Sequence, residues 1–75
     1  CDFVIKEREK ITHAVQVCFD LTEETQEREM RGLMGALQQF HLKEGLILTH
    51  KQEDELLIDG KKILVKPVWK WLLEQ

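Results

Sequence analysis

The chain contains no serine, only one proline, and just four glycines and two cysteines in 75 residues. Without serine there is no serine nucleophile. The scattered glycines form neither G-x-G-x-x-G nor G-x-x-x-x-G-K, so the sequence predicts no nucleotide-binding loop of its own. It also lacks a run of about 18 apolar residues and any charged-then-apolar leader of the secretory type. We therefore expect a cytoplasmic protein that does not contact a membrane.

The few potential thiol and imidazole ligands are dispersed along the chain. Cys1 and Cys18 fall on predicted strands without a secretory signal, which favours reduced thiols over a disulfide. His13, His41 and His50 form no spacing typical of a zinc site. Strand alternation puts His13 and Cys18 on opposite faces, so His13 is not placed to activate Cys18. We expect structural histidines and no cysteine hydrolase.

Length and composition predict a single small domain. The chain is 43% hydrophobic and 33% charged, as in soluble globular proteins. At this size folding buries only about 60% of the surface of the unfolded chain, so the core should be thin. The sequence opens at Cys1, within a predicted strand and without an initiator Met. We interpret residues 1–75 as one domain cut from a longer protein.

A net charge of −3 disfavours autonomous high-affinity binding to nucleic acid, which needs several cations against the phosphates. One basic stretch remains, residues 61–70, which has no acid. Its lysines and the neighbouring tryptophans are Lys61, Lys62, Lys66 and Lys70, with Trp69 and Trp71. This stretch is either a binding patch for nucleic acid or a partner, or a solvated strand edge beside two core tryptophans.

Two strands are predicted at the start of the chain. Residues 1–5 alternate in polarity, and the charged residues 6–10 then predict a turn. Residues 11–19 alternate again, but neither of their faces is strongly polar, which is typical of a strand covered on both sides. We expect the two strands to pair as an antiparallel hairpin.

A helix should follow, capped by Asp20 or Thr22. An apolar stripe at helical spacing marks its buried face: Met30, Leu33, Met34, Leu37 and Phe40. We interpret this stripe as core rather than as a methionine-lined groove. Gly45 is expected to end the helix in the left-handed conformation.

The second half of the chain predicts a parallel strand and a hairpin. Residues 46–50 form a short apolar run, which with the preceding strand and helix makes a βαβ unit. Asp59-Gly60 lies between two strand-like segments and is a strong hairpin signal, because both turn positions need positive φ.

Pro67 should begin a terminal helix over residues 68–73. We expect this helix to place its apolar residues mostly against the sheet: Val68, Trp69, Leu72 and Leu73. The predicted fold class is therefore mixed α/β, a small sheet with a ββαβ core, a hairpin and a short C-terminal helix.

This order of elements matches the frame of the metal-dependent PD-(D/E)XK nucleases. There, two carboxylates on strands hold Mg²⁺, and a lysine two residues after the second acid stabilises charge. In this chain Asp2 stands at the first acid and is the only candidate metal ligand. Gln16 and Cys18 stand where the second acid and the lysine would be. Alternatively, Gln16 is a polar residue bonded within the sheet and Asp2 an edge acid facing water.

Four segments carry a family resemblance: Cys-Asp-Phe-Val-Ile at residues 1–5, Gln-Val-Cys-Phe-Asp-Leu at residues 16–21, Arg28-Glu29, and Pro-Val-Trp-Lys-Trp-Leu at residues 67–72. With them the chain resembles the C-terminal domain, of unknown function, in a family of prokaryotic AAA+ superfamily ATPases. The resemblance implies a truncated restriction-endonuclease-like fold, and ATP and Mg²⁺ for the parent protein only. Many members have Glu-x-Lys where this chain has residues 16–18.

These observations predict a non-catalytic accessory or binding domain without a cofactor of its own. Its ligand would be DNA or a protein partner of the parent ATPase. Charge stabilisation at a reacting phosphoryl group is a large part of catalysis, so the missing lysine argues against cleavage. Two alternatives remain: a residual metal-dependent nuclease that uses Asp2 on DNA, and a structural module that forms a weak homodimer through a strand edge.

Overall fold

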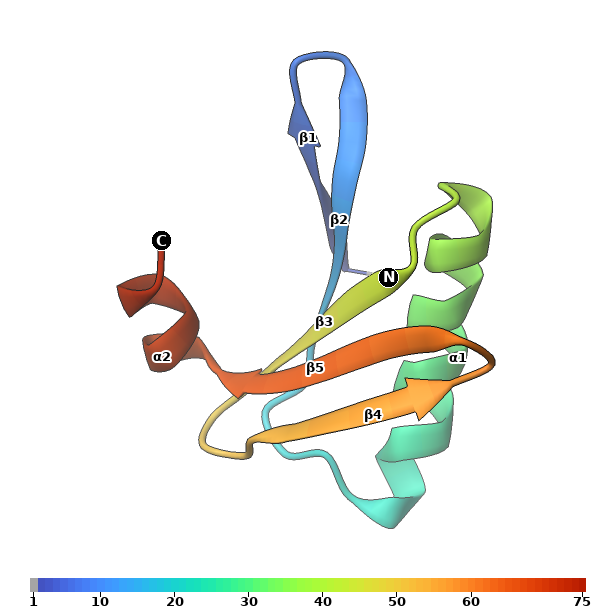
Figure 1. The fold of residues 1–75 in the computed structure, drawn as a ribbon. Helices are drawn as coiled ribbons and strands as arrows, with labels where there is room; N and C mark the ends of the chain where they lie inside the picture. Colours follow the sequence, from blue (N-terminus) through green and yellow to red (C-terminus); the bar gives the residue numbers. More distant parts are fainter. Residues whose placement is uncertain (1) are drawn as a thin grey trace.

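The chain folds into one mixed sheet with two helices. The computed structural model describes residues 2–75, and Cys1, predicted to begin the first strand and to carry a reduced thiol, lies outside them. In chain order the elements are β1 (Phe3–Glu7), β2 (Lys10–Val17), α1 (Glu23–Gln39), β3 (Glu44–Thr49), β4 (Asp54–Ile58), β5 (Lys61–Pro67) and α2 (Val68–Leu73) (Figure 1). The predicted mixed α/β class, with its ββαβ core, hairpin and terminal helix, is confirmed.

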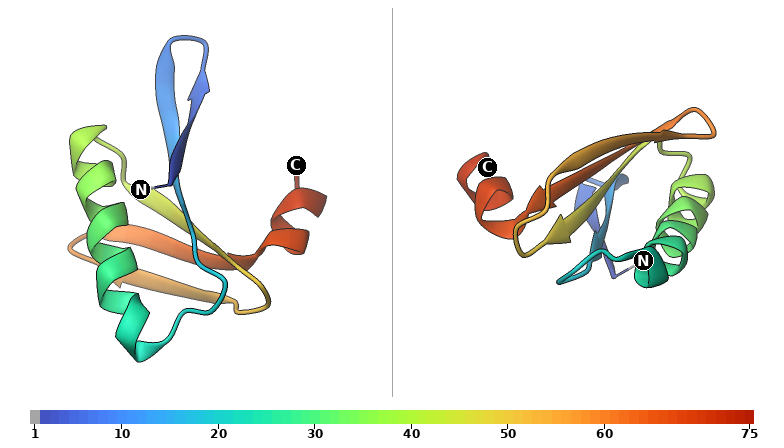
Figure 2. Two further views of the ribbon diagram at one scale, coloured as in Figure 1. Left: turned by 180° about the vertical axis from the view of Figure 1, so that it is seen from behind. Right: turned by 90° about the horizontal axis from the view of Figure 1, so that it is seen from below.

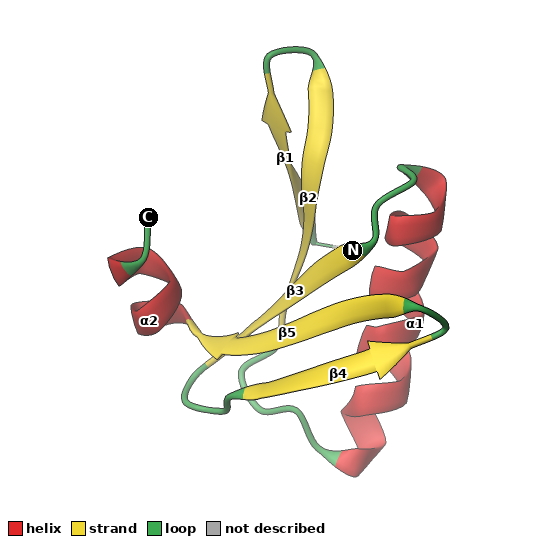
Figure 3. Cartoon of the chain, viewed as in Figure 1, coloured by secondary structure: helices red, strands yellow, loops and turns green. Residues whose placement is uncertain are grey.

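Within residues 2–75 the strand order is β1-β2-β3-β5-β4. The three inner strands run parallel, and each outer strand is antiparallel to its neighbour. Consequently β2, β3 and β5 all end at one edge of the sheet, here called the carboxyl edge (Figure 3). The order also places β5 between β3 and β4, although β4 precedes it in the chain.

The β1–β2 hairpin projects beyond the rest of the sheet (Figure 1). Only residues 15–17 of β2 pair with β3, so the first part of β2 is paired with β1 alone. The strands continue into the charged segment predicted as a turn, and the actual turn is shorter, with Arg8 at φ 60°. The charged side chains of this segment are exposed on a hairpin arm.

Helix α1 begins at a capping box. The hydroxyl of Thr22 accepts a hydrogen bond from the Thr25 N–H at 3.2 Å, and the Thr25 hydroxyl accepts one from the Thr22 N–H at 2.9 Å. Thr22, rather than Asp20, is therefore the cap. The predicted apolar stripe faces the sheet: Met30, Leu33 and Leu37 are buried, and Met34 and Phe40 pack against the same core.

Gly45 does not end the helix, contrary to the sequence prediction. The helix ends at Gln39, and His41 takes the left-handed conformation with φ 57°. Gly45 lies in β3, where a Cβ would come 3.0 Å from the Leu33 side chain. The glycine is required because α1 packs closely on the strand, not because the backbone turns there.

The β4–β5 hairpin forms as predicted around Asp59-Gly60, whose φ angles are 49° and 77°. Its strands pair in register from Ile58 and Lys61 onward. Both turn residues have positive φ, as a two-residue hairpin of the primed type requires.

The two faces of the sheet are covered unequally. Helix α1 lies along one face, over a core that includes Ala14, Ile47 and Ile63 (Figure 2). On the other face, a smaller cluster of Val15, Leu46 and Leu48 is covered partly by Trp71 of α2. Strand β2 thus carries buried residues on both faces, as its sequence indicates.

The predicted packing of α2 is wrong. Trp71 is the α2 residue that packs against the sheet core, whereas the four residues expected there are exposed: Val68, Trp69, Leu72 and Leu73. In six residues only Lys70 is polar, so apolar character alone does not select which face of the helix turns inward.

Candidate functional site

The structure brings the residues of the nuclease-like frame to neighbouring positions. Phe3 pairs with Val15, so the antiparallel register puts Asp2 beside the end of β2 that carries Gln16. Asp2 is exposed, and its Oδ2 accepts a hydrogen bond of 2.7 Å from the backbone N–H of Val17. The Asp2 carboxylate therefore extends the pairing between the first two strands.

Gln16 connects the sheet to α1. Its side chain is buried, at 8% exposure, and its Nε2 donates a hydrogen bond to the carboxylate of Glu29. Its Oε1 is buried and has no hydrogen-bond partner among residues 2–75. Of the alternatives for Gln16, the structure favours an internal polar contact, made between β2 and α1 rather than within the sheet.

Cys18 is half-buried and packs against the core beneath α1. It is a free thiol whose Sγ donates to the carbonyl oxygen of Asp20 at 3.4 Å. Its backbone N–H donates to the Leu48 carbonyl at 2.9 Å and prolongs the pairing of β2 with β3. Cys18 therefore occupies the lysine position of the frame with a side chain that has no positive charge.

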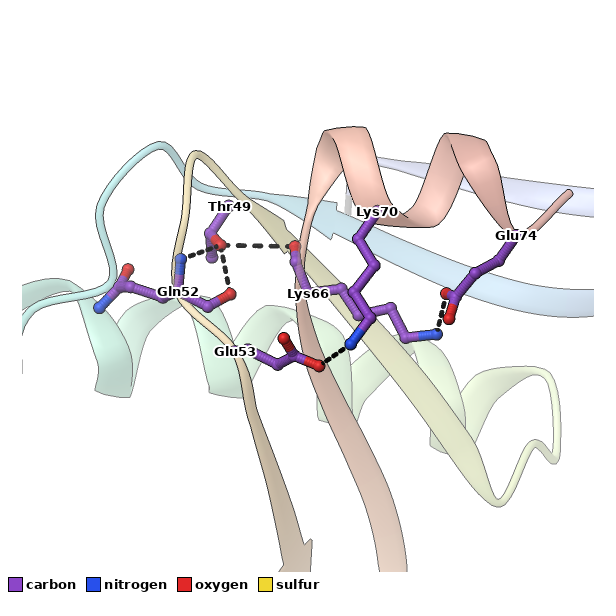
Figure 4. Close-up of polar contacts among 6 residues, drawn as sticks. All are labelled: Thr49, Gln52, Glu53, Lys66, Lys70 and Glu74. Carbon is purple, nitrogen blue, oxygen red and sulfur yellow. Dashed lines mark hydrogen bonds and ion pairs between the residues drawn. The ribbon is translucent and has the colours of Figure 1, made fainter.

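The four predicted lysines do not form one cationic patch. Lys66 binds Glu74 at 2.6 Å and Lys70 binds Glu53, so two of the charges are paired with carboxylates (Figure 4). Lys61 and Lys62 lie at the opposite end of β5. The tryptophans separate as well, with Trp69 exposed and Trp71 half-buried.

These two ion pairs fix α2 to the sheet. The hydrogen bond to Glu53 raises the pKa of Lys70, and the hydrogen bond from Lys66 lowers the pKa of Glu74. Together with Trp71 they hold the side of α2 that carries Lys70 and Trp71 against the rest of the fold. Its orientation thus depends on partners in β5 and in the loop before β4.

A glutamine clamp fixes that loop. The Gln52 side chain accepts from the Leu21 N–H at 2.6 Å and donates to the Leu21 carbonyl at 2.9 Å. The Thr49 hydroxyl donates to the Gln52 carbonyl at 2.8 Å and accepts from the Gln52 N–H at 3.0 Å (Figure 4). This clamp was not predicted from the sequence, because no local pattern links Leu21 with Gln52, which is 31 residues away.

An apolar groove of about 440 Å³ lies at the carboxyl edge, between α2 and the ends of β2 and β3. We call it the carboxyl-edge groove. Its lining residues are Val17, Phe19, Leu48, Thr49, His50, Val68, Trp69 and Leu72. In open α/β sheets, ligands bind outside the carboxyl ends of the parallel strands, and the groove lies at that edge.

The rim of the groove is built by an aromatic pair. The rings of Phe19 and His50 stack with centroids 4.6 Å apart, and the His50 N–H donates to the Phe19 carbonyl at 3.1 Å. Phe19 is 73% exposed, and on the other side Trp69 and Leu72 are 58% and 59% exposed. The sequence does contain one indication of this surface: the short C-terminal helix has more apolar residues than one buried side can hold.

Neither a metal-ligand cluster nor a membrane-spanning helix is found among the described residues. Within residues 2–75, no three His, Cys, Asp or Glu side chains gather closely enough to hold a metal ion. Neither of the two helices seen in this range has the length and apolar character needed to cross a membrane. Comparisons with protein-family models, with curated proteins and with solved structures found no match to this chain.

Proposed function

We propose that this domain is a non-catalytic binding module of a larger cytoplasmic protein and that it binds an apolar partner surface at the carboxyl-edge groove. The observation that carries the proposal is the outward apolar face of α2. The resemblance to the C-terminal domain of AAA+ ATPases supports an accessory role for it in such a protein.

The contacts of α2 with the rest of the fold determine that its apolar face points outward. Trp71 and the two lysine–carboxylate pairs hold one side of α2 against the sheet, which leaves the apolar side in water. Contiguous exposed apolar surface of this kind marks interaction sites in soluble proteins. Burial against a partner would remove this surface from water and stabilise the complex.

The residues of the nuclease-like frame support a binding role rather than a cleavage role. Asp2 is engaged by the Val17 N–H, and the Gln16 amide is engaged by Glu29. Cys18 supplies no cation where the nuclease frame has lysine. These contacts use the frame residues to join β1, β2 and α1.

The charge arrangement favours an apolar protein surface over DNA as the partner. A nucleic-acid interface needs several unpaired cations that face the phosphates together. Here Lys66 and Lys70 are paired with Glu74 and Glu53 beside α2. The carboxyl-edge groove, between α2 and the ends of β2 and β3, is lined by none of these four residues and mostly by apolar side chains.

Fluorescence of the dye 1-anilinonaphthalene-8-sulfonate tests the proposal, because the dye brightens on apolar protein surface. We expect saturable enhancement with the wild-type chain and a several-fold weaker response with Leu72→Glu. Leu57→Glu is the matched control, since Leu57 is 78% exposed on β4, away from the groove. Circular dichroism verifies that both variants are folded. An equal dye response in the two variants would refute the assignment of the groove.

A further inference from the structure

We propose that the surface bound at the carboxyl-edge groove is that of a second copy of the same chain, related by a two-fold axis. The inference rests on the proposed function and specifies its partner. The surface involved, called the α2 face below, comprises Val17, Phe19, Val68, Trp69, Leu72 and Leu73.

The extent of the α2 face fits a dimer. Its members are between 36% and 78% exposed, and Phe19 and Trp69 are the largest of them. Together they expose on the order of 600 Å² of apolar side chain, close to the ~800 Å² that each partner buries in a standard interface. The largest apolar patch of a typical monomer is ~300–600 Å², so this small domain is at the upper end.

The composition of the surface also fits self-association. Among the described residues that line the groove, only His50 is titratable, and its ring is stacked on Phe19. Interfaces between identical subunits are the more apolar class of protein interface. A second copy offers a surface of the same apolar character and extent.

Charge beside α2 does not oppose the approach of two copies. The chain carries a net charge of −3, but Glu53 and Glu74, the acids next to α2, are each paired with a lysine. Like-charge repulsion across the axis is therefore reduced where the two helices would meet. Both pairs also hold α2 in the orientation that the dimer needs.

Two features of the α2 face suit a two-fold contact. The α2 face has a groove and, next to it, a protruding side chain, Leu73, which is 78% exposed and does not line the groove. A two-fold axis lets the protruding residues of each copy enter the groove of the other, so both contacts form at once. Such a closed pair leaves no α2 face exposed.

The outer strands are less suited to this role than α2. Strand β4 begins with exposed acids at Asp54 and Glu55, and β1 ends in the charged hairpin arm. Charged side chains on edge strands discourage pairing between sheets. We therefore assign the dimer to the α2 face and not to a strand edge, which was an alternative left open by the sequence.

Sedimentation velocity over a micromolar to millimolar concentration series tests the proposal. We expect the wild-type chain to shift from monomer to dimer as its concentration rises. Leu73→Glu should raise the dimer dissociation constant about 100-fold, because a symmetric dimer carries the change twice and one leucine contributes about tenfold. Leu57→Glu is the matched control at the same 78% exposure, and it should associate as the wild type does.

Leu72→Glu serves as a second variant, and circular dichroism verifies that each variant is folded. A wild-type chain that stays monomeric throughout the series would overturn the dimer. So would equal weakening by Leu73→Glu and Leu57→Glu. Dye binding measured in dilute monomer separates the two proposals: if it persists and depends on Leu72, the groove stands without the dimer, and if it does not depend on Leu72, both proposals fail.

Discussion

The buried side-chain amide of Gln16 donates a hydrogen bond to the carboxylate of Glu29, and this contact joins β2 to α1. The position that would hold a catalytic acid in a nuclease-like frame thus contributes to helix packing. Glu29 is half-buried, so its carboxylate can turn toward water if the glutamine is removed. Gln16 has no such alternative, and the two residues should respond differently to substitution.

Glu29→Ala should lower the free energy of unfolding by about 1–3 kcal/mol, because it leaves the buried Gln16 amide without its acceptor. Gln16→Leu should cost less or be neutral, since it removes the buried polar group altogether. Urea denaturation measures both changes. Glu27→Ala is the control on the same helix. Glu27 forms an exposed ion pair with Arg31, and loss of this pair should change the free energy of unfolding by less than about 0.5 kcal/mol. A larger cost for Gln16→Leu than for Glu29→Ala would contradict this account.

Gly45→Ala should destabilise the fold by about 1–3 kcal/mol, because the new Cβ would lie 3.0 Å from the fully buried Leu33 side chain. Gly35→Ala is the matched control. Gly35 is exposed in α1 with nothing within 4 Å of the added atom, so alanine there should stabilise by about 0.5–1 kcal/mol. Thermal and urea unfolding of the two variants should therefore move in opposite directions.

The two tryptophans of α2 should differ in their effect on stability. Trp71 covers the cluster that contains Val15, Leu46 and Leu48, so Trp71→Ala should cost about 2–4 kcal/mol. Trp69 is 58% exposed, and Trp69→Ala should cost less than about 1 kcal/mol while it weakens dye binding at the groove. Comparable losses of stability in the two variants would contradict this packing, and a larger loss in Trp69→Ala would mean that α2 packs the other way round.

Attachment of α2 should depend on pH at both extremes. The pKa of Glu74 is lowered from its ordinary value of 4.5 by its contact with Lys66. The stability that this contact contributes is therefore present above pH 4.5 and is lost as the pH falls through the folded-state pKa. The pKa of Lys70 is raised from 10.5 by its contact with Glu53. The stability that this contact contributes is therefore present below pH 10.5 and is lost as the pH rises through the folded-state pKa.

Near-ultraviolet circular dichroism of the two tryptophans in α2 reports this attachment across pH. The stability difference between the wild type and Glu74→Gln should be present at neutral pH and should vanish in acid, where the wild-type carboxyl is protonated. A difference that grows as the pH falls below 4.5 would have the wrong sign for a lowered pKa.

The domain should not cleave DNA. With Mg²⁺ or Mn²⁺ and plasmid DNA we expect no nicking, because Asp2 and Gln16 are engaged in the fold and Cys18 replaces the lysine. Agarose electrophoresis checks this result, with Asp2→Ala as the control for a contaminating nuclease. Metal-dependent nicking that disappears in Asp2→Ala would establish the residual nuclease instead. A fluorescence anisotropy titration with DNA at low salt tests the remaining lysines, and we expect no saturable binding.

Local sequence predicts much of this fold. The period of the apolar residues identified α1 and its buried face, and alternation identified the first two strands, because these periods follow from backbone geometry. Asp59-Gly60 predicted its hairpin because the two residues tolerate positive φ. The register between β1 and β2, which the structure supplies, then brings Asp2 beside the end of β2 that carries Gln16.

Other features depend on contacts between segments that are distant in the chain. The sequence predicted that Gly45 ends the helix, but in the fold the Leu33 side chain packs directly against this glycine. The apolar residues of α2 go nearly all round a six-residue helix, so periodicity could not choose its inward side. The ion pairs of Lys66 with Glu74 and of Lys70 with Glu53 fix that side. Sequence therefore determined which elements form, whereas only the tertiary structure decided that an apolar face of α2 remains in water, because its anchors lie on other elements.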